Sequence, residues 1–326
     1  MSKKTYGSIL KNEIIEFIEF RKAQGLHHMC GAVLRRLDTY LTENAISVKK
    51  LTPDLIDTWV AKNFSDLNPN TVTSYVANYI QFAKYLNTIG IEAYLPITPP
   101  ARQSYVPYIF SKNEVEAIFY AADNLKSENN PKAELWVPML LRLLYGCGLR
   151  LSEALSLTFT DIDLDEGILF IRNAKGNKDR LVPMDKNLAE ILKEYCIDVQ
   201  RENNERKLLF ESSVKNRISN QISLRWFHRV LRDAGIGLLP TTENSVGRTR
   251  NICLNCFRHT FAVKSLHIQH VNNIDNYRVT PFLSTYLGHT KLAGTQKYLH
   301  MTAEISEDIH KTTTAYSRGL FPEVPR

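Results

Sequence analysis

The sequence predicts a mainly α-helical protein with a small β-hairpin, an α+β fold in two domains. Apolar residues recur every three or four positions through most of the first hundred residues and again after about residue 187, the spacing of amphipathic helices. The segment 167–184 differs, because two apolar stretches flank a polar centre that contains a glycine, as in two strands joined by a turn. At 326 residues the chain is also long for a single hydrophobic core.

Four helices are expected in residues 1–95, packed as a small bundle. Three have apolar faces within 8–20, 29–41 and 70–86. The remaining helix begins at Thr52, a suitable N-cap, with Pro53 at the first helical position. A proline is tolerated there because the N–H that it lacks would have no acceptor within the helix.

A linker is expected at 96–110, where four prolines occur without any apolar period. Residues 111–326 form the second expected domain. Its first helix begins at Ser111, because Glu114 three residues later completes a capping-box pattern. Further helices are expected at about 134–146, from near Ser152 and after about 187, with a loop at 238–250.

Charge and composition favour a cytoplasmic protein with a polyanionic partner. The formal net charge is +7 and the pI is near 9.0, a mild indication of nucleic-acid binding. Five cysteines in this length do not form a disulfide framework, and the N-terminus lacks the apolar core of a signal peptide. The most apolar run, 135–149, is too short to span a bilayer and contains Arg142. No membrane association is expected.

Two motifs imitate metal sites. Cys253, Cys256 and His259 are spaced three apart, but on a helix the third lies about 240° from the first, and no fourth zinc ligand follows. Packing of buried cysteines is the better interpretation. The acidic stretch 161–167 resembles a calcium loop, yet Glu166 stands where that loop requires glycine. Neither a metal nor a cofactor is expected.

A set of scattered groups remains. The candidates are Arg150, Glu153, Lys175, Arg258, His289 and Tyr298. Each alone has an ordinary explanation, as a surface charge, a cap or a core residue. Together they match cleavage of a phosphodiester without a metal. Two guanidinium groups would hold the non-bridging oxygens, a lysine would protonate the leaving oxygen, and a tyrosine hydroxyl would attack phosphorus.

Four ordered motifs strongly resemble those of the tyrosine recombinase (phage integrase) family over about residues 108–310. They are "YGCGLRLSEALSL", "NAKGNKDRLVPM", "NCFRHTFA" and "LGHTKLAGTQKYLH". The resemblance implies that Arg150, Arg258 and His289 are catalytic residues and that Tyr298 is the nucleophile. It further implies Lys175 as general acid and Glu153 as the acidic partner of Arg150.

One position departs from the family pattern, which is His-x-x-Arg around the second arginine. Here Asn255 stands in place of that histidine. An amide can donate to a phosphate oxygen but cannot act as a base near neutral pH. His259 is a poor substitute on sequence grounds, because family members commonly carry a histidine there as well. We therefore expect a lower efficiency rather than a loss of activity.

The resemblance also implies how the reaction is organised. Tyr298 would form a 3′-phosphotyrosyl bond, and strands would be exchanged through a Holliday junction without metal or ATP. Such a reaction needs four protomers on two duplexes of double-stranded recombination-site DNA, with accessory or sister recombinase proteins as further possible partners. Residues 1–95 would be the core-DNA-binding domain of a C-shaped clamp around DNA, and the tail at about 301–326 would dock on a neighbouring subunit or pack on its own.

Two alternatives stay open. One is a DNA-binding family member with weak or lost cleavage because of Asn255. The other is a type IB topoisomerase, which shares the chemistry, although the short helical N-terminal region disfavours it. The sequence does not distinguish integration or excision of a mobile element, including transposition, from resolution of chromosome dimers.

Overall fold

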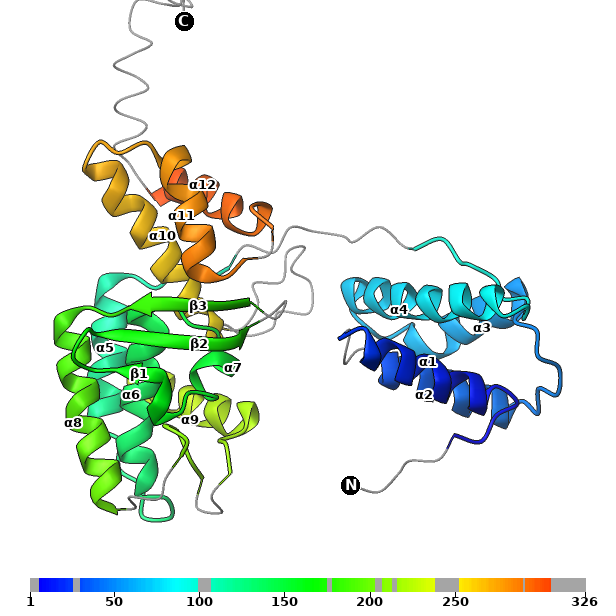
Figure 1. The fold of residues 1–326 in the computed structure, drawn as a ribbon, viewed down its shortest axis with the longest axis horizontal. Helices are drawn as coiled ribbons and strands as arrows, with labels where there is room; N and C mark the ends of the chain where they lie inside the picture. Colours follow the sequence, from blue (N-terminus) through cyan, green and yellow to red (C-terminus); the bar gives the residue numbers. More distant parts are fainter. Residues whose placement is uncertain are drawn as a thin grey trace, which may run out of the picture. The chain divides into compact units, whose positions relative to one another are not determined.

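The computed structural model of the chain describes residues 6–25, 30–98, 107–174, 178–202, 207–212, 216–237, 252–289 and 291–305 (Figure 1). The chain divides into two compact units, residues 1–104 and 105–326. Over the described residues the fold is mainly helical with a small antiparallel sheet, which confirms the predicted fold class. None of the helices in the described ranges is long and apolar enough to cross a bilayer.

The described part of the first unit contains a bundle of four helices. They are α1 (Lys11–Ala23), α2 (Cys30–Glu43), α3 (Pro53–Phe64) and α4 (Pro69–Thr88). The Thr52 side chain accepts the Leu55 N–H at the start of α3, as its N-cap position predicts. Trp59 of α3 and Tyr79 of α4 are fully buried, and their ring centroids lie 5.5 Å apart. Aromatic packing between facing helices therefore forms the centre of this core.

The second unit is built around the apolar helix α6. Its helices are α5 (Lys112–Asp123), α6 (Lys132–Gly146), α7 (Leu151–Ala154), α8 (Lys186–Glu202), α9 (Asn220–Asp233), α10 (Asn255–Val271), α11 (Asn276–Leu287) and α12 (Ala293–Ile305). Helices α5, α8, α9 and α10 all contact α6, which explains why α6 is apolar on almost every side. The capping box predicted at Ser111 and Glu114 is present.

The sheet has the order β1-β2-β3, with both pairs antiparallel. The predicted hairpin is formed by β2 (Ile168–Ala174) and β3 (Lys178–Pro183). The short strand β1 (Ile162–Asp163), which follows a 3₁₀ turn at Phe159–Asp161, was not predicted, because its two residues show no alternation. The Asp163 carboxylate accepts the N–H groups of the next turn, so the acidic stretch is a turn before a strand, as expected.

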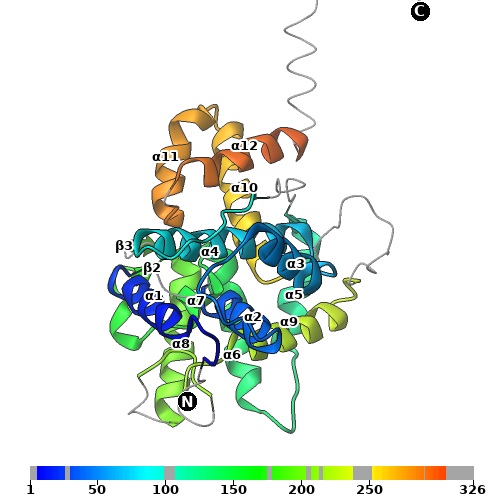
Figure 2. The same ribbon diagram turned by 90° about the vertical axis from the view of Figure 1, so that its right-hand side faces the viewer.

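Helices α10, α11 and α12 lie together in both views of the ribbon (Figures 1 and 2). A separate apolar cluster joins them, formed by Ala262, Val263, Leu266, Leu283, Leu287 and Tyr298. Helix α10 begins at Asn255, so Arg258 lies close to its start. Helix α12 runs through Ile305, so the first residues of the expected tail continue the helix that carries Tyr298. The expected loop at 238–250 lies outside the described residues.

Gly148, between α6 and α7, is a position where only glycine fits. Its φ of +58° is in the left-handed region, and a Cβ there would lie 2.6 Å from the Phe261 ring. We expect Gly148→Ala to lower the free energy of unfolding by roughly 2–4 kcal/mol, since backbone strain adds to overpacking. Urea unfolding measures the change. Gly235→Ala is the control, because φ is +70° there with open space around the Cβ, and it should cost only about 1 kcal/mol.

Candidate active site

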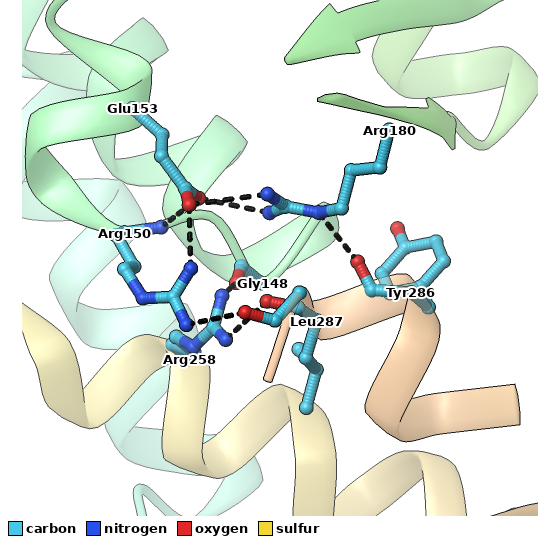
Figure 3. Close-up of polar contacts among 8 residues, drawn as sticks. Gly148, Arg150, Glu153, Arg180, Arg258, Tyr286 and Leu287 are labelled. Carbon is cyan, nitrogen blue, oxygen red and sulfur yellow. Dashed lines mark hydrogen bonds and ion pairs between the residues drawn. The ribbon is translucent and has the colours of Figure 1, made fainter. Parts of the chain in front are cut away.

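Glu153 lies at the centre of a buried ion cluster (Figure 3). Arg150 is the N-cap of α7, so the side chain of Glu153, three residues on, folds back onto it. The Glu153 carboxylate accepts the Arg150 backbone N–H at 2.9 Å and the Arg150 Nη1 at 2.6 Å. The pairing of Arg150 with Glu153 expected from the sequence is therefore present in the fold.

Arg180 of β3 completes this cluster; it lies within the motif "NAKGNKDRLVPM", but the sequence suggests no role for it. Its Nη1 and Nη2 donate to the two Glu153 oxygens at 3.1 and 2.8 Å, and its Nε donates to the Tyr286 carbonyl at 2.7 Å (Figure 3). The Arg180 side chain is only 8% exposed. Gly288, at the left-handed end of α11, leaves room for it, because a Cβ there would lie 3.0 Å from Nη1. Arg180 thus ties the hairpin to α7 and α11.

The two arginines determine the charge state of Glu153. Burial alone would raise its pKa, but hydrogen bonds from Arg180 and from the Arg150 backbone N–H, with the Arg180 charge, lower the pKa to about 2. The carboxylate is therefore ionised at neutral pH. It offsets the repulsion between two neighbouring cations, which would otherwise oppose the fold.

The stability of the second unit is expected to depend on Glu153 in acid. A carboxyl whose pKa is lower in the folded chain stabilises the fold above its unfolded pKa, here about 4.5, and loses that contribution as the pH falls through about 2. Glu153→Gln should cost about 3 kcal/mol at pH 7, and its difference from wild type should shrink as the pH is lowered from 4.5 to 2. Urea unfolding across this range measures both. A constant difference at every pH would contradict this role, and the exposed Glu166→Gln provides the control.

Arg258 of α10 is almost fully buried, with 2% of its surface exposed. Its Nη1 donates to the Gly148 carbonyl at 2.7 Å, and its Nη2 donates to the Leu287 carbonyl (Figure 3). The Arg150 Nη2 donates to the adjacent carbonyl of Gly288 at 2.8 Å. Two guanidinium groups therefore meet at the C-terminal end of α11, where the helix dipole favours cations. Burial and the nearby Arg150 lower the pKa of Arg258 to about 10, which leaves it charged at neutral pH.

His289 follows the end of α11 and lies beside Tyr298. Its Nδ1 is 2.7 Å from the buried Thr295 hydroxyl, and its ring centroid is 6.4 Å from that of Tyr298. Burial, followed by the charges of Arg258 and Arg150, lowers the pKa of His289 to about 4. The ring is therefore neutral at pH 7, and one nitrogen can donate while the other accepts.

Tyr298 of α12 is 1% exposed. Burial raises the pKa of its hydroxyl to about 12, although the charges of Arg258 and Arg150 act in the opposite direction. At neutral pH the phenol therefore keeps its proton. A phenol becomes a strong nucleophile only when a neighbouring group takes that proton.

Two further residues are linked to the Tyr298 hydroxyl. His259 Nδ1 lies 2.7 Å from the Tyr298 oxygen, and His259 Nε2 lies 3.0 Å from Asn255 Nδ2. Nothing in the sequence alone favours His259 over its neighbours. The spacing of four residues between Asn255 and His259 can be recognised in the sequence, and it places both on one face of a helix. That α12 packs against this face cannot be recognised there. The predicted general acid, Lys175, lies outside the described residues.

The neighbouring cysteines pack as expected. Cys256 is fully buried in the core of the second unit, and Cys253 is half-buried just before α10. Their sulfur atoms are 3.7 Å apart. His259 contacts the Tyr298 hydroxyl, whereas the two cysteines contact each other.

Comparison with known proteins agrees with these motifs. The model of the phage integrase family matches residues 109–304. XerD of Pseudomonas putida, named as a tyrosine recombinase, is 26% identical and covers 83% of this chain and 85% of its own. XerC of Chlorobaculum tepidum, also named as a tyrosine recombinase, is 28% identical and covers 94% of this chain and 87% of its own.

A solved structure has the same fold. The XerH site-specific recombinase bound to a palindromic difH substrate has a TM-score of 0.63 at 19% identity, covering 87% of this chain and 77% of that one. The family model spans more than half of the chain, and Arg150, Arg258, His289 and Tyr298 lie close together within that span. The chain belongs to the phage integrase family of tyrosine recombinases, which are enzymes that break and rejoin DNA.

Proposed function

We propose that this protein is a site-specific recombinase in which Tyr298 attacks the scissile phosphate of DNA. The attack forms a bond between the tyrosine oxygen and phosphorus and releases a 5′ hydroxyl. The 5′ hydroxyl of a partner duplex then displaces the tyrosine, so the energy of the phosphodiester is kept in the 3′-phosphotyrosyl bond. Two such exchanges would build and resolve a Holliday junction.

The other residues have distinct roles in this proposal. Arg150 and Arg258 would hold the non-bridging oxygens, and a neutral His289 would donate a further hydrogen bond to the phosphate. Glu153 would keep Arg150 in place, and Lys175 would protonate the departing 5′ oxygen. Asn255, in place of the family histidine, would support the phosphate or its neighbours without acting as a base.

The observation that carries the proposal is the convergence of Arg150 and Arg258 at the end of α11, close enough to Tyr298 to influence its pKa. Two fixed cations beside a buried, protonated phenol suit a reaction in which negative charge develops on a phosphate. The separate helical unit of residues 1–104 is consistent with a DNA-binding role for 1–95, with 96–110 as linker.

The proposed assembly is a homotetramer on two duplexes, acting in the cytoplasm on double-stranded DNA. Residues 301–326 would dock on a neighbouring subunit. The net charge of +7 favours association with DNA. The alternative within the same family is a chain that binds DNA without cleaving it.

Trapping a covalent adduct tests the proposal. A DNA site is first selected from a randomised duplex library by binding to the wild-type chain. It is then synthesised with a series of nicks, so that the short fragment bearing the released 5′ hydroxyl diffuses away after cleavage. We expect an adduct that is stable to denaturant and lost on protease treatment, with the nucleotide attached to the peptide containing Tyr298.

Two results would contradict the proposal. Tight binding of the selected duplex without an adduct at any nick position would indicate the non-cleaving alternative. Relaxation of supercoiled plasmids that lack the selected site would indicate a topoisomerase instead.

A further inference from the structure

His259 contacts the atom that would attack the phosphate. We propose that His259, held by Asn255, accepts the proton of the Tyr298 hydroxyl and so supplies the base that this chain lacks at position 255. The proposal rests on the role of Tyr298 as nucleophile. It gives Asn255 the role of a positioning residue, acting through His259.

The fold places the three groups in a line. Asn255 and His259 are four residues apart on α10 and so lie on the same face of the helix. Helix α12 packs on α10 and brings the Tyr298 oxygen to 2.7 Å from His259 Nδ1, while Asn255 Nδ2 lies 3.0 Å from Nε2. His259 is 5% exposed, so its ring is held by packing as well as by these contacts.

His259 is uncharged before DNA binds, as a proton acceptor must be, but its lowered pKa makes it a weak base in that state. Burial, with the neighbouring cations Lys297 and Arg258 and the ring of His289, lowers the pKa of His259 to about 3. At neutral pH the imidazole is therefore uncharged, and one of its two nitrogens carries no proton. A DNA phosphate placed against the two arginines would add negative charge nearby and favour the imidazolium that forms when the proton is taken.

Asn255 determines which nitrogen accepts. A neutral imidazole carries its proton on one nitrogen only, and the group bonded to the other nitrogen selects the tautomer. In the structure the Asn255 Nδ2 is the atom that lies next to His259 Nε2, so the proposal requires the amide to turn over and present its oxygen to Nε2–H; the exposed position of Asn255 allows this. Nδ1 is then unprotonated and faces the Tyr298 hydroxyl. If the amide nitrogen faced Nε2 throughout, Nδ1 would carry the hydrogen and donate to the phenol instead.

The bond between the Tyr298 oxygen and phosphorus forms as its O–H bond breaks and the proton moves to His259 Nδ1. The bond between phosphorus and the 5′ oxygen breaks, and that oxygen takes a proton from the general acid. On rejoining, His259 returns its proton to the tyrosine oxygen, so the ring is neutral again after each exchange.

The tautomer is measured first, in the protein without DNA. Nitrogen NMR of histidine-labelled protein distinguishes a protonated from an unprotonated ring nitrogen, and the His259→Asn protein identifies the resonance. We expect His259 with the proton on Nε2 and with Nδ1 accepting. In Asn255→Asp, whose carboxylate can only accept, the same tautomer should persist. A wild-type ring with the proton on Nδ1 would overturn the proposal.

The second measurement is the rate of adduct formation on the nicked duplex. Asparagine at position 259 places an amide where Nδ1 now lies, so it keeps a hydrogen-bonding group but cannot take a proton. We expect His259→Asn to lower the rate by about 10²–10³-fold, the usual effect of losing a general base. Asn255→Ala should lower the rate by a smaller factor and Asn255→Asp should restore it. His270→Gln, on the exposed end of the same helix, is the control and should match wild type.

The pH dependence separates a base from a positioning residue. Without an internal base, the rate should follow the small fraction of ionised tyrosine and rise roughly tenfold per pH unit from 7 to 9 in His259→Asn, while wild type changes little. A His259→Asn protein with the wild-type rate and pH profile would overturn this inference and leave the proposed function intact. Absence of any adduct in wild type would overturn both. Thermal melting and DNA binding of each variant show that the fold is retained.

Discussion

Replacing Tyr298 by phenylalanine is expected to abolish the covalent DNA adduct while leaving DNA binding within about twofold of wild type. The substitution removes the single oxygen that would bond to phosphorus, and no other atom of the ring can replace it. Adduct formation on the nicked duplex and affinity for the intact duplex are the two measurements. The first should fall below detection and the second should not.

The packing around Tyr298 explains why the fold should survive. The ring lies in the apolar cluster of α10, α11 and α12, and phenylalanine keeps that shape. Loss of the hydroxyl leaves His259 Nδ1 without this bond, at a cost of about 1 kcal/mol in the free energy of unfolding. Tyr286→Phe is the matched control, because this half-buried tyrosine also bonds through its hydroxyl, to the Pro183 carbonyl at 3.4 Å.

An adduct that persists in Tyr298→Phe would assign the nucleophile to another residue. Peptide mapping of that adduct would then identify it. Loss of the adduct in both Tyr298→Phe and Tyr286→Phe would instead indicate that the end of α11 tolerates no change, so that the loss at position 298 would say nothing about the nucleophile.

Residues that act through their own motif could be predicted from the sequence. Arg150 is preceded by two glycines and followed by a helix, and Glu153 lies within one turn of it, so their pairing follows from local geometry. The helix positions in the first hundred residues follow from apolar spacing in the same way. The strand β1 does not, because two residues carry too little periodicity to be recognised.

Contacts between distant segments could not be predicted in this way. In the sequence, Arg180 is simply a charged residue in a predicted strand. Its burial is seen only in the structure, where β3 packs against α7 and α11. His259 reads as a common family residue, and its contact with Tyr298 depends on how α12 packs on α10. For both residues, the contact that suggests a role is made with a partner at least 27 positions away in the chain.

Replacing Arg258 by lysine is expected to lower the rate of adduct formation by about 10³-fold, although the positive charge is retained. The guanidinium group reaches the Gly148 and Leu287 carbonyls at the same time, and its planar fork is suited to such paired contacts. A lysine ammonium is a single compact charge and cannot keep both carbonyls while also contacting a phosphate oxygen. The loop before α7 would then be less firmly held to the end of α11.

This change should reduce both stability and catalysis, and the two effects can be separated. Leaving one buried carbonyl unsatisfied costs about 1–3 kcal/mol in the free energy of unfolding, which urea unfolding measures. A rate deficit that remains at a temperature well below the melting midpoint, with DNA at saturating concentration, reflects the lost contact to the phosphate. Arg278→Lys, on the exposed face of α11, is the control and should change neither quantity.

The outcome decides how Arg258 acts. A large rate deficit with a small loss of stability places its main contribution in the transition state, where charge on the phosphate is greatest. A loss of stability with an unchanged rate would make Arg258 a structural residue that joins α10, α11 and the loop before α7, and would leave Arg150 as the group that binds the phosphate. Because Arg258 is 2% exposed and Arg150 has a 22% exposed side chain, a bound phosphate must draw Arg258 partly away from its carbonyls to be held by both. Lysine at 258, which makes fewer bonds to those carbonyls, therefore tests whether the paired contacts prepare the arginine for DNA or only hold the fold.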